Sequence, residues 1–428
     1  MKTKKLVVSI FAAGILASPL ANATNGYFSH GYGMKAKGMG GAATAMAIDA
    51  MGGANNPASM VWVGDRLDVG IDWFSPKRGA SRTGSFADFT EESTNDNFFV
   101  PEFGYNHMMS PVMSLGVTVY GNGGMNTSYT QANSVAGPGG CGATPTNPLC
   151  IPSKLGMNLE QLIVAPTLAY KLNETNSIGI SPLIGYQRFG ANGLGAFAPI
   201  SSDPANLTDN GYDSSTGWGI RFGWQGKMSD SVTLGAAYST KMKMGKFDKY
   251  RGLFAEQGGF DIPENFNLGI ALKATDSTTI AADYQRINYG DIPSVANPST
   301  QPGCPGTGCL GGSTGIGFGW SNVNVFKIGV MHQYNDYLTV SAGFDHSDNP
   351  IQARDTTFNI IAPGVVQDHL TAGITYAVDR ASEINVSYMH AMKNKTTGVP
   401  NVAYFNMGGT EELHMYQNSL GISYGVKF

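Results

Sequence analysis

Charged residues are scarce in this chain of 428 residues, and their charges nearly cancel. Lys and Arg number 27 and Asp and Glu number 31, which is 14% of the chain and leaves a net charge of −4. Proteins that bind nucleic acids carry a clustered excess of Lys and Arg instead. The composition therefore predicts that the chain has no nucleic-acid partner.

Long apolar runs are also missing beyond the N-terminus. After residue 23 no stretch of about 18 consecutive apolar residues occurs, the length that a membrane-spanning helix requires. Residues 1–23 have a lysine-rich start, an apolar stretch too short to span a bilayer, and the small-residue pattern Ala21-Asn22-Ala23. This arrangement is typical of a secretory signal peptide with its cleavage site. We expect the mature chain to begin at Thr24.

Signatures of catalysis and of metal binding are missing as well. The sequence has no Gly-x-Ser-x-Gly nucleophile elbow, and its seven histidines are scattered. Ser347 and Ser387 lie near His346 and His390, but neighbours in a strand often face opposite sides of a sheet. We therefore expect no enzymatic activity, no metal site and no cofactor.

What the chain does contain is a pattern of alternating side chains. Residues 420–428 alternate apolar side chains with Gly, Ser, Gly and Lys, and they end on the aromatic Phe428. A period of two predicts a strand with one apolar face. We expect this segment to be the last strand of an outer-membrane β-barrel, which closes the sheet against the first strand.

Short and long connections alternate between such strands from about residue 66 onward. The short connections carry turn-forming residues such as Asn, Asp, Ser and Pro. Six short turns and seven long connections join fourteen strands. The turns are Ser110-Pro111, Asn173–Asn176, Ser229–Ser231, Asp276-Ser277, Asn335-Asp336 and Asp379–Ser382, and the long connections lie near residues 77–97, 124–158, 191–214, 248–263, 291–321, 347–366 and 394–412.

This alternation predicts an all-β fold, a 14-stranded antiparallel transmembrane β-barrel formed by residues 66–428. Bacterial outer-membrane barrels have an even number of strands, short periplasmic turns and long outer loops. β-Sandwiches and propellers fit less well, because their connections do not alternate in length so regularly. We expect the barrel to be a monomer in the lipid of the outer membrane of a Gram-negative cell.

The four cysteines fall in two of the long connections, with Cys141 and Cys150 in the second and Cys304 and Cys309 in the fifth. Strand parity places both connections outside the cell, where disulfides persist. We expect the local disulfides Cys141–Cys150 and Cys304–Cys309. A metal site is the weaker alternative, because no histidine is close to either pair and the spacings differ from those of zinc ligands.

Residues 24–65 differ in kind from the rest of the chain. They are rich in Gly, Ala, Met and Asn and lack a clean strand period. Gly38–Ala43 formally matches a dinucleotide-binding fingerprint, but no strand precedes it, so we reject that interpretation. A barrel of this size leaves a lumen unless something fills it. We expect residues 24–65 to fill it as an N-terminal hatch.

Elements at both ends of the chain resemble the FadL-type outer-membrane transporters of long-chain fatty acids and other hydrophobic compounds. They are Asn25-Gly26-Tyr27-Phe28, the Gly-rich stretch Gly38–Ala50, Asn55-Asn56-Pro57-Ala58 before the first strand, and the terminal Phe428. The resemblance covers the mature chain and implies a barrel plugged by a hatch. It further implies capture of the ligand between outer loops, passage to a pocket at the hatch, and lateral exit through a wall gap at an inward kink of the third strand.

Candidate site residues follow from this resemblance and from apolar side chains in the predicted loops. Gly121, Gly123 and Gly124 lie near the end of the third strand, where glycines permit a bulge or bend. The hatch motif is Asn56, Pro57 and Ala58. The candidate ligand-binding residues are Asn25, Tyr27 and Phe28 in the hatch, and Leu155, Met157, Leu159, Leu162 and Phe197 in the second and third long loops.

The sequence thus predicts transport of hydrophobic small molecules, with long-chain fatty acids as the first choice. Binding would depend on apolar burial, worth about 25 cal/mol per Å², and would need no covalent step. Two alternatives stay open at this point. One is uptake of toluene-like aromatic hydrocarbons by the same route, and the other is a non-specific porin.

Overall fold

The structure is a computed structural model that describes residues 24–130, 141, 145–300, 304–402, 405–406 and 408–428. The predicted signal peptide, residues 1–23, lies outside the described residues. Among the described residues, no helix combines the length and the apolarity needed to cross a membrane.

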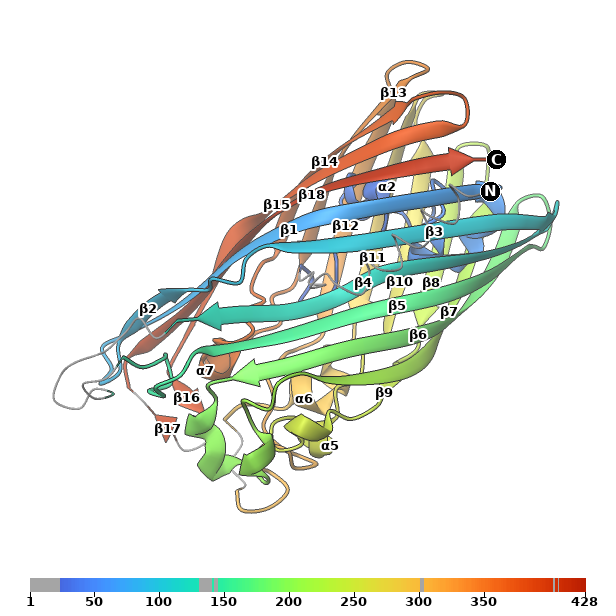
Figure 1. Cartoon of the computed structure of the whole chain (residues 1–428). Coiled ribbons are helices and arrows are strands. Elements are labelled where there is room, and N and C mark those ends of the chain that lie inside the picture. The colour runs from blue at the N-terminus through green and yellow to red at the C-terminus, as the bar shows by residue number, and fades with distance from the viewer. Residues whose placement is uncertain (1–23, 131–140, 142–144, 301–303, 403–404, 407) are drawn as a thin grey trace, which may run out of the picture.

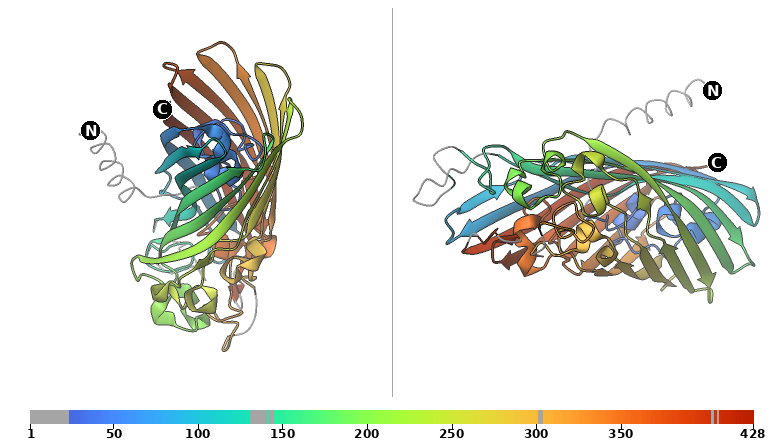
Figure 2. Two further views of the ribbon diagram at one scale, coloured as in Figure 1. Left: turned by 90° about the vertical axis from the view of Figure 1, so that its right-hand side faces the viewer. Right: turned by 90° about the horizontal axis from the view of Figure 1, so that it is seen from below.

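A closed antiparallel barrel forms the body of the protein (Figures 1 and 2). Fourteen long strands follow one another around the barrel, and the last pairs with the first, which confirms the predicted fold class. They are β1 (Arg66–Thr83), β3 (Phe98–Ser110), β4 (Met113–Tyr129), β5 (Leu155–Lys171), β6 (Asn176–Asn192), β7 (Asp213–Lys227), β8 (Val232–Ser239), β10 (Asn265–Lys273), β11 (Thr278–Ile287), β12 (Val323–Gln333), β13 (Leu338–Ser347), β14 (Asp368–Ala377), β15 (Ser382–Gly398) and β18 (Thr410–Lys427).

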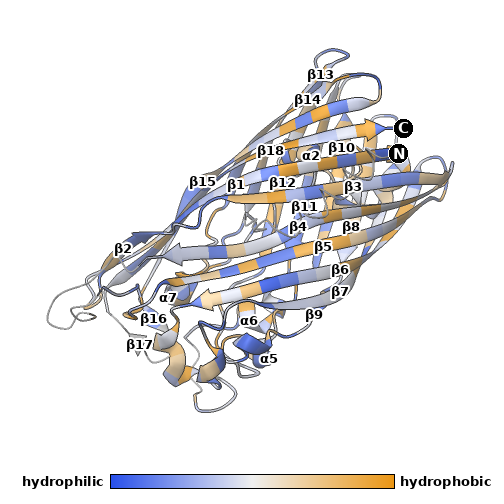
Figure 3. Cartoon of the chain, in the orientation of Figure 1, coloured by the Kyte–Doolittle hydropathy of each residue, from blue (hydrophilic) through white to orange (hydrophobic). Residues whose placement is uncertain are grey.

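The alternating sequence pattern separates the two faces of the wall. In β1, Ile71 and Trp73 are exposed on the outer face, whereas Asp68 and Asp72 are buried on the inner face. The closing ladder keeps this order, because Ile71 pairs with Ile422 of β18. Apolar and polar residues therefore alternate along the strands in Figure 3, as they do in membrane barrels.

Several strands are longer than the sequence pattern predicts. β1 continues to Thr83, β4 continues to Tyr129, and β5 already begins at Leu155. The predicted loops at 77–97 and 124–158 were therefore too long. The added ends of β1 and β4 carry no apolar alternation, because they lie beyond the lipid, where an outer face need not be apolar. The added start of β5 does alternate, but its apolar residues Leu155 and Met157 face inward.

Short elements occupy the interior and the extracellular loops. Near the N-terminus lie α2 (Met34–Lys37), α3 (Gly52–Asn55), η1 (Pro57–Ser59) and α4 (Met60–Val63). The loops contain the short strands β2 (Phe89–Glu92), β9 (Lys243–Met244), β16 (Asn401–Val402) and β17 (Phe405–Asn406), and the helical turns η2 (Gly195–Ile200), η3 (Pro204–Asn206), η4 (Asp248–Tyr250), α5 (Ala255–Gly258), η5 (Tyr289–Asp291), α6 (Pro293–Ala296), η6 (Ala353–Asp355) and α7 (Thr356–Asn359).

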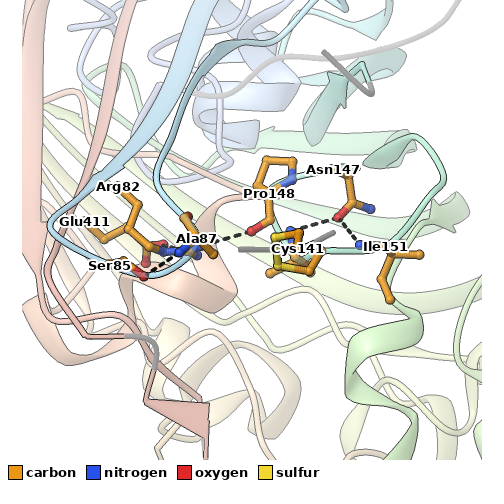
Figure 4. Close-up of a disulfide and its surroundings, with 10 residues drawn as sticks. Arg82, Ser85, Ala87, Cys141, Asn147, Pro148, Ile151 and Glu411 are labelled. Carbon is orange, nitrogen blue, oxygen red and sulfur yellow. Dashed lines mark hydrogen bonds and ion pairs between the residues drawn. A yellow bond between two sulfur atoms is a disulfide. The ribbon is translucent and has the colours of Figure 1, made fainter. Parts of the chain in front are cut away.

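Two disulfides lie in the extracellular loops, Cys141–Cys150 and Cys304–Cys309. The first lies near a buried arginine that ties three segments together (Figure 4). Arg82 Nη2 donates to Glu411 Oε1 of β18 at 2.7 Å, and its Nη1 donates to the carbonyl oxygens of Ala87 and Pro148 at 3.1 Å each. The loop is thereby fixed to the rim of the barrel on the side of β1 and β18.

Candidate transport site inside the barrel

The N-terminal segment, Thr24–Asp65, lies inside the barrel (Figure 2). Inward-facing side chains of the wall bind its backbone on several sides. The N–H groups of Ala43 and Thr44 donate to Asp283 Oδ2 of β11 at 2.9 Å each, and the N–H of Ala50 donates to Asp68 Oδ2 of β1 at 2.8 Å. Because buried N–H groups must find acceptors, these carboxylates fix the irregular backbone of the segment.

Ion pairs add to this attachment. Lys37 Nζ lies 2.8 Å from Asp72 Oδ2 and 3.7 Å from Glu102 Oε2, all three side chains being buried. Burial disfavours the charged ammonium, but the two carboxylates outweigh that effect and raise the pKa of Lys37. Lys327 of β12 donates to the carbonyl oxygen of His30 at 2.7 Å. The segment is therefore held by charged groups of the wall as well as by apolar packing.

The motif Asn56-Pro57-Ala58 anchors the segment to β6 and β7. Asn56 is fully buried, and its Nδ2 donates to the carbonyl oxygens of Thr44 at 2.8 Å and Trp224 at 2.9 Å. Its Oδ1 accepts the N–H of Ala58 at 3.1 Å, which caps η1. A Cβ at Gly179 of β6 would lie 2.4 Å from the carbonyl carbon of Pro57, so the motif requires a glycine in the wall.

Residues Asn25–Phe28 form a turn that is held by an aromatic residue of an outer loop. The hydroxyl of Tyr289 accepts the N–H of Tyr27 at 3.0 Å and donates to the carbonyl oxygen of Asn25 at 2.7 Å. The ring of Tyr27 lies 4.9 Å from that of Tyr289 and 5.9 Å from that of Trp320, measured between centroids. The turn thus packs into an aromatic cluster beneath the extracellular loops.

β4, the third long strand, separates from β3 midway along the wall. The β3–β4 ladder ends at the pair Phe103↔Val119, although β3 itself extends further toward its own N-terminal end. Against β5, the register of β4 shifts between Gly121 and Gly123, so Asn122 is an extra residue. A one-residue bulge bends a strand. The wall therefore has no β3–β4 ladder beyond Val119.

The N-terminal turn contacts β4 at this bulge. Phe28 forms a bridge with Gly123, and the N–H of Gly124 donates to the carbonyl oxygen of Tyr27 at 3.2 Å. A Cβ at Gly123 would lie 1.8 Å from the same oxygen. The close approach of the two backbones therefore requires glycine at this position.

Two hollows lie near the bulge. A narrow pocket with a volume of about 10 Å³ is lined by Gly26, Arg78, Met125, Asn126, Trp320 and Met415, among others. A groove of about 370 Å³ lies at the extracellular ends of β4, β5 and β6 and is lined mainly by polar residues, including Asn95, Lys154, Asn158 and Tyr212. The two hollows are neighbours, because Asn95 of the groove accepts a hydrogen bond from Arg78 of the pocket at 3.5 Å.

The structure brings most of the candidate ligand-binding residues together and separates one of them. Tyr27, Phe28, Leu155, Met157, Leu159 and Phe197 belong to one buried apolar cluster, and Asn25 lies beside it. Leu155, Met157 and Leu159 face inward from strand β5, so their assignment to a loop was wrong. Leu162 is not buried. Successive side chains of a strand point to opposite faces, and the odd-numbered residues of this part of β5 face inward, so Leu162 faces outward.

Sequence reasoning missed several residues of this region. Tyr289 and Trp320 lie in long loops, where no periodic pattern marks a buried side chain. Arg78 was placed in a loop, but it belongs to β1 and faces inward like Asp72 and Arg82. Every second residue of β1 from Asp68 onward faces inward, and continuing that count to residue 78 could have identified Arg78.

The chain is similar to proteins of known structure over nearly its whole length. The toluene transporter TodX of Pseudomonas putida is 18% identical, with a TM-score of 0.72, and the match covers 93% of this chain and 99% of that protein. A FadL homologue of Pseudomonas aeruginosa is 15% identical, with a TM-score of 0.65 and coverage of 96% and 100%. The toluene transporter TbuX of Ralstonia pickettii is 17% identical, with a TM-score of 0.63 and coverage of 93% and 99%. These likenesses show a shared fold.

A search among curated proteins finds no match to this sequence. Residues 17–427, however, match the family described as outer membrane protein transport protein (OMPP1/FadL/TodX). With a closed barrel of fourteen strands and a family match over almost every residue, the chain belongs to the OMPP1/FadL/TodX family of outer-membrane transporters of hydrophobic compounds.

Proposed function

We propose that this protein takes up long-chain fatty acids across the outer membrane, by capture at the extracellular loops, passage past the N-terminal segment and lateral exit through the wall. The observation that carries this proposal is the break between β3 and β4. It lies at a one-residue bulge, beside the turn Asn25–Phe28 and a pocket. A break in the ladder is the place where an apolar molecule can leave for the lipid without entering water.

In this account the N-terminal segment acts as a hatch. It is attached firmly through Asn56 and Asp283 on the side of β6, β7 and β11. Its first turn contacts the bulge through the backbone of Gly123 and Gly124. It is held besides by Tyr289, by the ring of Trp320 and by one hydrogen bond from Asn25 Nδ2 to Asp345 Oδ2 at 3.2 Å. A displacement of that turn alone would connect the pocket with the break, while the remainder of the segment continues to fill the lumen.

Aromatic hydrocarbons are a second candidate class of substrate. Two of the structural relatives are described as toluene transporters, and the rings of Tyr27, Tyr289 and Trp320 lie within 6 Å of one another. Aromatic side chains of this kind can stack on a monocyclic ligand. A non-specific porin is disfavoured, because the N-terminal segment occupies the lumen.

Deletion of Asn122 tests the lateral exit. The deletion removes the extra residue and restores a regular β4–β5 ladder, so we expect β4 to straighten toward β3 and uptake of radiolabelled oleate by cells to fall to the background rate. Deletion of Lys393 is the matched control, because it removes one residue at a second bulge, in β15, away from β3 and β4.

Both variants must first migrate as folded barrels in unheated gels. We expect the Lys393 deletion to take up oleate at the wild-type rate. A folded Asn122 deletion that takes up oleate as fast as the wild type would contradict exit through this break.

A further inference from the structure

Arg78 is a buried cation that lacks a counter-charge. Its side chain faces the inside of the barrel from β1 and is 3% exposed. Nη1 donates to the carbonyl oxygen of Asn95 at 3.5 Å, and the guanidinium carbon lies 5.7 Å from the ring centroid of Phe98. Nη2 has no hydrogen-bond acceptor among the described residues.

Three other inward-facing cations of the barrel and its N-terminal segment have carboxylate partners, whereas Arg221 and Lys327 form no ion pair among the described residues and donate to neutral oxygens. Arg66 binds Asp68 and Glu383, Arg82 binds Glu411, and Lys37 binds Asp72. No ion pair among the described residues includes Arg78, and Nη2 is the one arginine or lysine nitrogen there that is buried without an acceptor. A buried charge without a partner is strongly unfavourable.

Asp96 is the carboxylate whose charge acts on Arg78, but it forms no ion pair with it. Asp96 forms an ion pair with Lys77 and accepts the amide of Asn97 at 2.6 Å. Lys77 precedes Arg78 on the same strand and faces the other side of the wall, as the alternation of a strand requires. Asp96 is thus already engaged, while Arg78 lines a pocket and keeps Nη2 without an acceptor.

That pocket is apolar apart from Arg78 and the amide of Asn126. The rest of its lining is Met125 of β4, Met415 of β18, Trp320, residues 362–364 and Gly26 of the N-terminal turn. Arg78 and Met415 are direct partners in the closing β1–β18 ladder, while Asn126 lies four residues past the bulge residue Asn122. The pocket therefore adjoins the break in the wall.

We propose that Arg78 binds the carboxylate of a long-chain fatty acid at the break between β3 and β4, while the acyl chain packs on the methionines and Trp320. This inference rests on the proposed function, because it assigns to Arg78 the selection of the fatty acids that the protein is proposed to transport. A guanidinium binds a carboxylate through strong, charge-assisted hydrogen bonds. Because the volume is now that of about one water molecule, the headgroup enters when the turn at Gly26 is displaced.

The test compares two ligands that differ only in the headgroup, oleate and oleyl alcohol, binding to the purified full-length protein at pH 8. We expect the wild type to bind oleate roughly ten- to a hundredfold more tightly than the alcohol, the range of a charge-assisted hydrogen bond. In Arg78→Gln the affinity ratio should fall to near one through loss of oleate binding alone. Arg78→Lys should keep part of the preference.

Arg251→Gln is the control, because Arg251 is an exposed loop arginine paired with Asp203, and it should leave the ratio unchanged. A folded Arg78→Gln protein that prefers oleate as strongly as the wild type overturns the role of Arg78. A wild type that binds both ligands equally overturns it as well. A wild type that binds neither ligand refutes the proposed function first, and the role of Arg78 with it.

Discussion

At the scale of single residues, charge inside the barrel is concentrated where the N-terminal segment meets β1, β3 and β15. Five carboxylates and three cations gather there, and the carboxylates are in excess. The carboxylates are Asp49, Asp68, Asp72, Glu102 and Glu383, and the cations are Lys35, Lys37 and Arg66. Of these carboxylates, Asp49 has no ion pair with a cation among the described residues. Burial, together with the charge of Asp68, raises its pKa from 3.8 to about 7.

This shift predicts a pH dependence that belongs to Asp49. The folded protein keeps a proton on Asp49 that the unfolded chain has already released between about pH 4 and pH 7. The contribution to stability is therefore full below pH 4, declines as the pH rises through this window, and is constant above it. Asp49→Asn mimics the protonated form and should remove the decline, as measured by the urea midpoint at pH 5 and pH 8.

The comparison between the two proteins isolates this residue from the other titrating groups. We expect the wild type to lose more stability than Asp49→Asn on going from pH 5 to pH 8. Equal losses in the two proteins, or a larger loss in the variant, would show that Asp49 is ionised in the folded state.

At the scale of elements, the N-terminal segment and the wall are fitted to each other through glycine. Gly179 lies under Pro57, and Gly123 lies under Tyr27, in both cases with no room for a Cβ. The first contact is with the motif Asn56-Pro57-Ala58, and the second is with the mobile turn of the proposed mechanism. A single added methyl group therefore perturbs either contact without changing the charge of the lumen.

Conductance in planar bilayers measures whether the segment closes the barrel. Deletion of residues 24–65 should open a path for small ions, because these residues lie inside the barrel. Gly179→Ala should give a smaller or intermittent conductance, since its Cβ would lie 2.4 Å from the backbone of Pro57. Gly195→Ala should conduct no more than the wild type, because its Cβ meets nothing closer than 3.8 Å. A deletion mutant that conducts like the wild type would contradict the hatch.

At the scale of the whole molecule, the barrel could be predicted from the sequence because the same pattern of strand and turn recurs along the chain. Alternation with a period of two and turns of Asn, Asp and Ser recur along the chain, so fourteen strands follow from many weak local signals. The extracellular ends of the strands could not be predicted, because polar residues beyond the lipid lack that alternation. Arg78 was misplaced for this reason, whereas Leu155 was misplaced because the apolar side chains at the start of β5 face inward instead of outward.

The interior could be predicted only in outline. That Asn56 is a structural anchor depends on Trp224, which lies 168 residues away along the chain. That Arg78 lacks a counter-charge depends on which side chains of β4, β18 and the loops surround it. Such contacts join residues that are far apart in the chain, and local sequence patterns do not predict them.

The proposed function requires that hydrophobic molecules pass selectively through a barrel that is closed to water-soluble ones. The most direct test is uptake of radiolabelled oleate, toluene and a small sugar by cells that lack their own transporters for hydrophobic compounds, with and without this protein. We expect the protein to accelerate oleate uptake and to leave sugar uptake unchanged, while a preference for toluene would shift the substrate to aromatic hydrocarbons. Sugar uptake that rises together with oleate uptake would contradict selective transport and indicate an open porin.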